Sequence, residues 1–381
     1  MKKKILTIVG ARPQIIKASA VSRAVQKRSE KLEEIIVHTG QHYDENMSAV
    51  FFEELGIPKP QYNLSVGSGS HGVQTARMLE GIEELILSER PDAVLVYGDT
   101  NSTIAGALAA AKLHVPVIHI EAGLRSFNKQ MPEEINRIAC DHMSTLLFCP
   151  TESAIQNLLK EGFDPGQSGK ATPDHPKFYH CGDIMYDNSM HFSKVSENRS
   201  QIIEKLGLEK DSYVLVTIHR DSNTDVAEHL EEIFSALLAI QENSGLTIVL
   251  PIHPRTSGKL KEKLSSELYQ TLMNVPNIKI IPPAGFLDII ALEKNARMII
   301  TDSGGLQKEA FFFKKPCLIL RPQTEWVELV TNGNALLADH SKERILFSFD
   351  ALMRKTDFTF PEFYGDGNAA GFICETILQD L

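Results

Sequence analysis

Acidic residues follow apolar runs in the first half of this 381-residue chain, where parallel strands would present them to a ligand. Asp99 comes shortly after the run 93–97, and Glu121 comes directly after the run 115–120. The carboxyl ends of parallel strands meet at one edge of a sheet, so we expect both carboxylates to lie at that edge. Carboxylates that converge on one site can hold one another's pKa near neutrality, which suits proton transfer.

A third carboxylate, Glu133, stands at the start of an expected helix. Pro132 is typical of the first helical position, and Glu133 precedes Arg137 by four residues, the spacing of a helical ion pair. Glu133 is therefore a further acid or base candidate. The alternatives are structural: Asp99 as the N-cap of a helix over 100–111, and Glu133 as a favourable charge at a helix N-terminus.

Histidines follow apolar runs in the second half of the chain. His219 comes directly after the run 213–218, and His253 comes after the run 247–252, two positions before Arg255. An imidazole changes its charge near neutral pH, so such a side chain can serve catalysis, although a structural role is the alternative for each.

The segment Ser303-Gly304-Gly305 follows the apolar run 298–301 and opens an expected helix. Two glycines let backbone N–H groups approach a diphosphate at the positive end of a helix. The spacing is not that of a Walker loop. Glu309, further along the helix, can accept hydrogen bonds from ribose hydroxyls, or it is an ordinary solvated glutamate.

Two cations lie close to the end of the first apolar run, 5–9. Arg12 precedes Pro13, which suits the first turn of a helix, and Lys17 falls on that helix. Both are expected to face a ligand crevice, the alternative being a strand cap and a solvated lysine. The stretch 67–72 matches Gly-x-Gly-x-x-Gly, but only a poor strand precedes it, so an ordinary loop is favoured over a nicotinamide site.

Short β-branched runs alternate with longer amphipathic stretches along the whole chain, which predicts an α/β fold with parallel sheets. We expect two Rossmann-like doubly wound domains that face a central cleft. The first covers 1–190 and carries the carboxylates, and the second covers 191–365 and binds the nucleotide. The expected strands are 5–9, 35–39, 93–97, 115–120, 146–149, 178–181, 213–218, 247–252, 278–281, 298–301 and 317–320.

Charge and composition exclude several classes of protein. The formal net charge of −10 offers no field for a nucleic acid, although a small anion remains possible as a ligand. Five scattered cysteines without a Cys-x-x-Cys pair argue against disulfides and zinc, and they fit a cytoplasmic protein. No apolar stretch approaches the ~18 residues of a membrane helix, so we expect no membrane insertion. We find no cofactor or metal motif.

Taken together, these motifs resemble those of the non-hydrolysing UDP-N-acetylglucosamine 2-epimerases. The resemblance covers almost the whole chain in order, and it rests on GARP at 10–13 with Lys17, TGQH at 39–42, YGDT at 97–100, HIEAGLR at 119–125, MPEEINR at 131–137, HR at 219–220, HP at 253–254 and TDSGG at 301–305. It implies the two-Rossmann GT-B glycosyltransferase architecture, a homodimer, and a C-terminal helix in 366–381 that returns to the first domain.

The resemblance also implies the reaction and the residues. UDP leaves C1 by anti elimination with loss of the C2 proton, and the resulting 2-acetamidoglucal takes UDP back with the other stereochemistry. Such enzymes supply precursors of cell-surface polysaccharides. The implied catalytic residues are Asp99, Glu121, Glu133 and His219. The implied ligands of the UDP-sugar are Arg12, Lys17, Arg137, Arg255, Phe286, Ser303, Gly304, Gly305, Glu309 and Arg321.

Departures from the family pattern concern the substrate. The chain has GARPQ at 10–14, HRDSN at 219–223, HPR at 253–255 and TEWVE at 324–328, which look like the branch acting on UDP-2,3-diacetamido-2,3-dideoxyglucuronate. Arg255 would then pair with the sugar carboxylate. Gln41 and His42 match a possible effector site, but Ser68 and Gly69 stand where a basic residue is common. A glycosyltransferase, a hydrolysing epimerase and a non-catalytic UDP-sugar binder are the alternatives.

Overall fold

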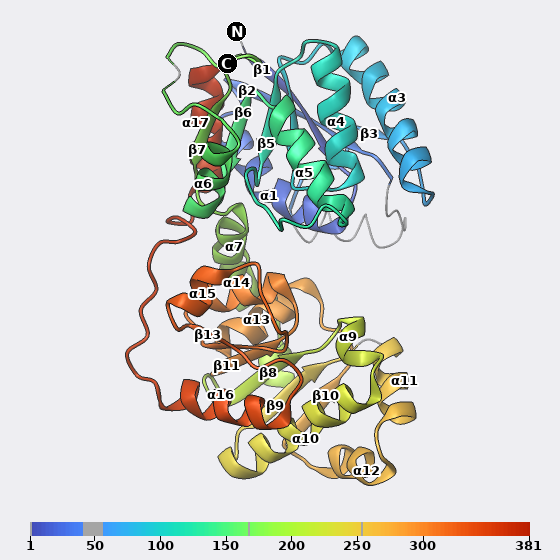
Figure 1. Ribbon diagram of the computed structural model, residues 1–381, viewed down its shortest axis with the longest axis vertical. Helices are drawn as coiled ribbons and strands as arrows, with labels where there is room; N and C mark the ends of the chain where they lie inside the picture. The colour runs from blue at the N-terminus through green and yellow to red at the C-terminus, as the bar shows by residue number, and fades with distance from the viewer. Residues whose placement is uncertain (1, 41–55, 167, 253) are drawn as a thin grey trace. The chain divides into compact units, whose positions relative to one another are not determined.

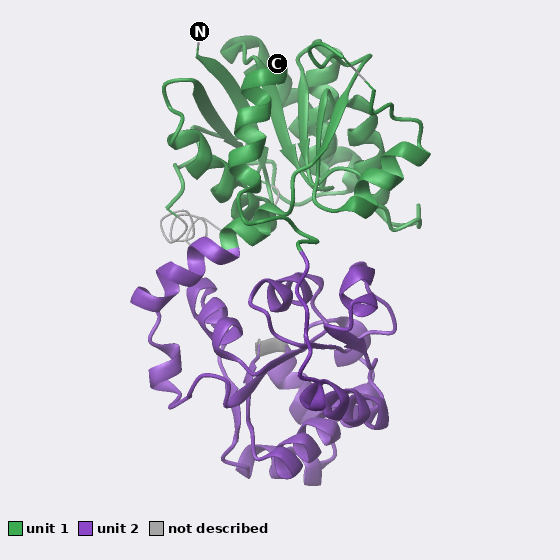
Figure 2. Ribbon diagram, turned by 90° about the vertical axis from the view of Figure 1, so that its left-hand side faces the viewer, with its two compact units in different colours: residues 1–188, 362–381 green, residues 189–361 purple. Residues whose placement is uncertain are grey.

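The computed structural model describes residues 2–40, 56–166, 168–252 and 254–381, and the chain forms two compact units. Unit 1 comprises residues 1–188 and 362–381, and unit 2 comprises residues 189–361 (Figure 2). Each unit is an α/β layer structure with a wholly parallel sheet, which confirms the predicted fold class (Figure 1).

Unit 1 contains a seven-stranded sheet in the order β3-β2-β1-β4-β5-β6-β7. The order reverses between β1 and β4, and this switch point is where open α/β sheets bind their ligands. The strands are β1 (Lys3–Val9), β2 (Leu32–His38), β3 (Tyr62–Asn63), β4 (Ala93–Tyr97), β5 (Val117–Ile120), β6 (Leu146–Cys149) and β7 (Lys177–His180), and the helices are α1 (Arg12–Gln26), α3 (His71–Glu89), α4 (Asn101–Lys112), α5 (Pro132–Met143), α6 (Glu152–Lys160), α7 (Ile184–Arg199), which continues into unit 2, and α17 (Ala369–Asp380).

Unit 2 contains a six-stranded sheet in the order β10-β9-β8-β11-β12-β13, with its switch point between β8 and β11. The strands are β8 (Tyr213–Thr217), β9 (Thr247–Pro251), β10 (Ile278–Ile281), β11 (Met298–Thr301), β12 (Cys317–Ile319) and β13 (Ala335–Leu337), and the helices are α8 (Ile202–Lys205), α9 (Asp221–Thr224), α10 (Ala227–Ser244), α11 (Pro254–Lys263), α12 (Ser266–Asn274), α13 (Phe286–Asn295), α14 (Gly304–Phe312), α15 (Val327–Thr331) and α16 (Lys342–Arg354).

The central strands are apolar on both faces because helices cover both sides of each sheet. Every residue of β4 and of β8 is buried. In unit 1, Leu6, Ile8, Val94 and Val96 join a core cluster with residues of α3 and α4. This pattern explains why the strands read as continuous apolar runs. The short strands β3 and β13, with two and three residues, were not among the expected strands.

The two connections that link unit 1 to the rest of the chain lie side by side within unit 1. Asp183 N–H donates to the Tyr364 carbonyl at 2.9 Å. Asp187, in the first turn of α7, accepts the N–H groups of Ala369 at 3.0 Å and of Ala370 at 2.8 Å. A carboxylate thus caps the N-terminus of α17, which packs against α1. Burial raises the pKa of Asp187 to about 6, although the two backbone N–H groups oppose this rise.

This pKa predicts a specific pH dependence of stability. Native Asp187 binds its proton more tightly than the unfolded chain does, so its contribution to the free energy of unfolding grows as pH falls from about 6 to about 4. Asp187→Asn should lose this dependence. The difference in unfolding free energy between wild type and variant should change by up to about 1.4 kcal/mol per pH unit in that window, measured by urea unfolding with circular dichroism. Asp174→Asn, which removes an exposed carboxyl of unit 1, is the control. A difference that stays constant from pH 4 to 6 would contradict the prediction.

Candidate functional site

The switch point of unit 1 brings together four of the predicted site residues. Asp99 and Glu121 follow the carboxyl ends of β4 and β5, which are neighbours in the sheet. Lys17 comes from α1, and Arg137 comes from α5. Arg12, the exposed first residue of α1, follows β1 on the other side of the switch point.

Lys17 and Glu121 form a largely buried ion pair, with 17% and 14% of their side chains exposed. Burial lowers the pKa of Lys17, but the charges of Glu121, Asp99 and Asp183 outweigh burial, so the pKa is raised and the amine is protonated. Gly98 lies against this pair. A Cβ at Gly98 would lie 3.3 Å from Glu121 Oε2 and 3.4 Å from Lys17 Nζ, and its φ of +61° also favours glycine.

Arg137 joins Asp99 to α5, but its partner on α5 is not the expected one. Its guanidinium forms ion pairs with Asp99 and with Glu134, at i,i+3. The expected pairing with Glu133 at i,i+4 is therefore wrong. Glu134 is buried and also accepts the N–H groups of Ser126 and Phe127, each at 2.9 Å. Glu133 is exposed, so its carboxylate is left to face a ligand or solvent.

The structural alternative for Asp99, as the N-cap of the helix that follows it, is wrong. Thr100 is the N-cap of α4, and its side chain accepts the N–H of Thr103. Asp99 instead uses its carbonyl to accept from Asn136 Nδ2 at 2.9 Å and its carboxylate to pair with Arg137. Arg137 of α5 thus orients the Asp99 carboxylate, which does not cap α4.

Gln14, to which the sequence motifs assigned no role, closes the switch point. Its side-chain oxygen accepts the N–H of Gly10 at 2.9 Å, and its Nε2 donates to the Tyr97 carbonyl at 2.9 Å and to Thr103 Oγ1 at 3.1 Å. A glutamate at position 14 could not replace this side chain, because an ionised carboxylate has no N–H group to donate to the Tyr97 carbonyl. Gln14 therefore joins the ends of β1 and β4 through both halves of its amide.

Asp302 organises the switch point of unit 2. Its fully buried carboxylate accepts the N–H of His219, the N–H of Arg220 and the side-chain amide of Asn223, each at 3.0 Å. These bonds join the end of β11 to the loop after β8 and leave His219 and Arg220 exposed. The sequence motif contains Asp302, but its positioning role depends on this contact between distant segments.

The fold does not require the two glycines at the start of α14. Ser303 is the N-cap, and its side chain makes no capping hydrogen bond. A Cβ at Gly304 or Gly305 would meet its nearest atoms at 3.7 and 3.8 Å, which is ordinary contact, and neither residue has a positive φ. Neither the packing around α14 nor its backbone conformation therefore requires a glycine at these two positions.

Charged side chains surround this helix start. Arg321 is buried and pairs in bidentate fashion with Glu325, at 2.8 Å for each bond. Trp326 Nε1 donates to the Gly304 carbonyl at 2.9 Å. Glu309 is half-buried on α14, and its charge adds to burial in raising the pKa of the neighbouring Glu293 well above its usual range.

One further predicted residue is buried, and several others lie outside the described part. Phe286 is the buried first residue of α13, and its ring packs edge-on against Phe192 with centroids 5.0 Å apart. Gln41, His42 and His253 lie outside the described residues, as does the side chain of Arg255, whose backbone belongs to α11. The glycines of 67–72 follow a loop that hydrogen-bonds to residues after β2, and α3 begins at His71.

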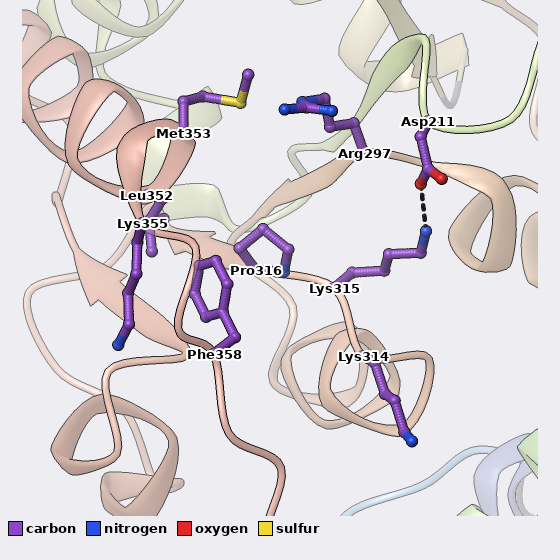
Figure 3. A pocket seen from close by; sticks show the side chains of 9 residues that line it. All are labelled: Asp211, Arg297, Lys314, Lys315, Pro316, Leu352, Met353, Lys355 and Phe358. Carbon is purple, nitrogen blue, oxygen red and sulfur yellow. Dashed lines mark hydrogen bonds and ion pairs between the residues drawn. The ribbon is translucent and has the colours of Figure 1, made fainter.

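A basic pocket at the opposite edge of the unit 2 sheet has a structural explanation (Figure 3). It lies beside the C-terminal ends of α14 and α16, whose carbonyl groups attract cations. Lys315 pairs with Asp211 at 2.6 Å, and Lys355 donates to the Gly333 carbonyl at 3.0 Å. The lining residues are Asp211, Arg297, Lys314, Lys315, Pro316, Leu352, Met353, Lys355 and Phe358.

Comparison with known proteins places the chain in a family. Residues 23–378 match the UDP-N-acetylglucosamine 2-epimerase family. The chain belongs to this family. It is thus a UDP-amino-sugar 2-epimerase, an isomerase, which confirms the resemblance found in the motifs. No helix among the described residues is long and apolar enough to cross a membrane.

Relatives of this epimerase are named after two different UDP-sugars. The chain is 48% identical over 379 residues to the UDP-N-acetylglucosamine 2-epimerase homolog of Methanococcus maripaludis, covering 99% of this chain and 100% of that protein. It is 50% identical over 377 residues to the UDP-2,3-diacetamido-2,3-dideoxy-D-glucuronate 2-epimerase of Pseudomonas aeruginosa, covering 99% of each.

Solved structures agree with the fold of this epimerase. The UDP-GlcNAc 2-epimerase of Methanocaldococcus jannaschii, in complex with UDP-GlcNAc and UDP, is 41% identical, with a TM-score of 0.80 and all of both chains covered. Medicago truncatula UGT71G1, complexed with UDP-glucose, shares the fold with a TM-score of 0.64 at 10% identity, covering 100% of this chain and 98% of that one. The GT-B-like architecture expected from the resemblance is confirmed.

The two adjacent glutamates of α5 provide a matched pair of variants. Glu134→Gln should lower the free energy of unfolding by about 2–3 kcal/mol, because it weakens a buried ion pair and a cap on two backbone N–H groups. Glu133→Gln should change it by less than about 0.5 kcal/mol, as expected of an exposed side chain. Urea unfolding of both variants measures the difference. Equal losses in the two variants would show that Glu134 does not hold the loop before α5.

Proposed function

We propose that this epimerase interconverts UDP-N-acetylglucosamine and UDP-N-acetylmannosamine through a 2-acetamidoglucal. A base takes the C2 proton, the C1–C2 double bond forms, and the bond from C1 to the β-phosphate oxygen breaks with its electron pair leaving on UDP. Addition of UDP to C1 with protonation of C2 from the other face reverses the sequence. The observation that carries the proposal is the set of oriented carboxylates at the switch point of unit 1. The glycine-lined start of α14 in unit 2 supports it.

The carboxylates of unit 1 suit the proton transfers. Asp99, Glu121 and Glu133 are the acid and base candidates in this proposal. Lys17 pairs with Glu121 and Arg137 pairs with Asp99, so both carboxylates are held in defined positions, as a base requires. Glu133 is exposed and can reach a bound sugar without losing a structural contact.

The residues of unit 2 suit the leaving group. Negative charge grows on the diphosphate as the anomeric bond breaks, and oriented N–H groups and cations stabilise that charge. We assign this role to the start of α14 with Ser303, Gly304 and Gly305, and to Arg321 and His219. Glu309 is assigned to the ribose, and Phe286 is assigned to the uracil side of the ligand.

A second substrate is favoured by a specific observation. The named diacetamido-glucuronate epimerase of Pseudomonas aeruginosa is 50% identical to this chain over nearly its whole length. The same 2-epimerisation on UDP-2,3-diacetamido-2,3-dideoxyglucuronate is therefore the alternative, with Arg255 as the partner of the C6 carboxylate. In either case we propose a cytoplasmic homodimer that supplies cell-surface polysaccharide precursors.

Variants separate the chemistry from nucleotide binding. Asp99→Asn, Glu121→Gln and Glu133→Gln should each lower kcat by roughly 10²-fold or more, with nearly unchanged affinity for UDP, because these groups act on the sugar. Gly305→Val should instead weaken UDP binding, since its side chain blocks the approach of phosphate to the backbone. Turnover is followed by proton NMR and UDP affinity by calorimetry. Carboxylate variants with wild-type turnover would remove these groups from the mechanism.

Proton NMR of the products from the two UDP-sugars decides the substrate. Arg255→Ala should cost roughly 10- to 100-fold in kcat/KM on the uronate, because a charge-assisted pair is lost, and little on UDP-N-acetylglucosamine. Equal losses on both sugars would assign Arg255 to the diphosphate or to the fold. A wild-type enzyme that converts neither sugar would refute the proposed function.

A further inference from the structure

A histidine lies directly beneath the carboxylate site of unit 1. His119 is the third residue of β5 and is fully buried. Its Nδ1 lies 2.7 Å from Asp141 Oδ1 on α5, and its Nε2 lies 2.8 Å from the Gly98 carbonyl oxygen after β4. Neither the motifs nor the proposed mechanism assigns a role to this side chain.

Both partners of His119 are acceptors, which determines its protonation. A carbonyl oxygen can only accept a hydrogen bond, so Nε2 carries a proton, and an ionised Asp141 requires a second proton on Nδ1. Asp141 has its own donors, because its Oδ2 accepts the N–H of Gly123 at 3.1 Å and pairs with Arg125 Nη1 at 2.7 Å. Burial opposes the charged imidazole, but Cys140 and Asp141 outweigh it, and the pKa of His119 is raised well above its usual range.

The bonds of His119 end on the two loops that carry the catalytic candidates. Gly98 immediately precedes Asp99, and its N–H donates to the Ile120 carbonyl at 3.0 Å, just before Glu121. Gly123, held by Asp141, lies two residues after Glu121. Glu121 itself has a φ of +72°, a conformation that costs a non-glycine residue free energy and that persists where the surroundings hold it.

We propose that His119, as an imidazolium paired with Asp141, is a positioning residue that sets the distance between the Asp99 and Glu121 carboxylates in the epimerisation. The inference rests on the proposed function, because it assigns those two carboxylates to catalysis. A neutral imidazole can donate only one hydrogen bond here and would leave either the Gly98 carbonyl or Asp141 facing a lone pair. The loops would then shift, and a displacement of about 1 Å at a reacting group can cost 10²-fold in rate.

The test combines kinetics of two variants with NMR of the protons on the His119 ring. Asp141→Asn keeps the shape of the partner but removes its charge, and His119→Gln removes the imidazolium. In both variants we expect kcat to fall roughly 10²-fold while KM and UDP affinity stay within about twofold, because the nucleotide residues are untouched. His180→Gln changes an exposed histidine at the end of β7 in the same sheet and serves as the control. Urea unfolding, measured in parallel, separates lost stability from lost turnover.

Nitrogen-15 NMR of the wild-type protein measures the protonation of the His119 ring directly, and this measurement does not depend on the stability of a variant. We expect one histidine with protons on both ring nitrogens throughout pH 6 to 9, and its signal should be missing from His119→Gln. A folded variant with wild-type kcat, or a His119 ring that carries one proton in this range, would overturn the proposal. If the wild-type enzyme converts neither UDP-sugar, the proposed function fails, whereas the NMR result still reports whether the imidazolium exists.

Discussion

The arrangement of unit 1 depends on one buried interaction, the hydrogen-bonded pair of His119 and Asp141. Buried polar side chains are costly unless their hydrogen bonds are satisfied, and here they are. The imidazole uses both nitrogens, and the carboxylate also accepts from Gly123 and Arg125. An apolar pair could stabilise the core equally well, but it could not orient the backbone at Gly98 and Gly123.

In the proposed function, the two units use the same switch-point geometry for different chemistry. In unit 1 the loops after β4 and β5 carry carboxylates, and cations from α1 and α5 hold these carboxylates in place. In unit 2 the buried Asp302 accepts backbone N–H groups and thereby leaves His219 and Arg220 exposed. Proton transfer needs oriented acids and bases, whereas a leaving diphosphate needs donors and positive charge. The proposed division between the units follows from that difference.

Much of this architecture is predictable because buried parallel strands leave a strong pattern of short apolar runs. The residues that end these runs were also predictable, since the carboxyl edge of such a sheet is where ligands bind. The roles of Glu133 and Glu134 were not, because sequence spacing does not determine which of two adjacent side chains points inward. Asp141 and Gln14 carry no local signal either, as their function lies in contacts with residues more than twenty and eighty positions away. The short β3 and β13 are held by their neighbours and not by their own composition.

The fate of the C2 proton is the most direct test of the proposed reaction, because elimination and re-addition must exchange this proton. The enzyme is incubated with its UDP-sugar in deuterium oxide, and both epimers are recovered and examined by NMR. Elimination and re-addition should place deuterium at C2 of the epimerised sugar, introduced by a carboxylic acid that has exchanged with solvent. Epimerised sugar that retains its original proton at C2 would contradict the account, because the configuration would then have changed without removal of that proton by a protein base.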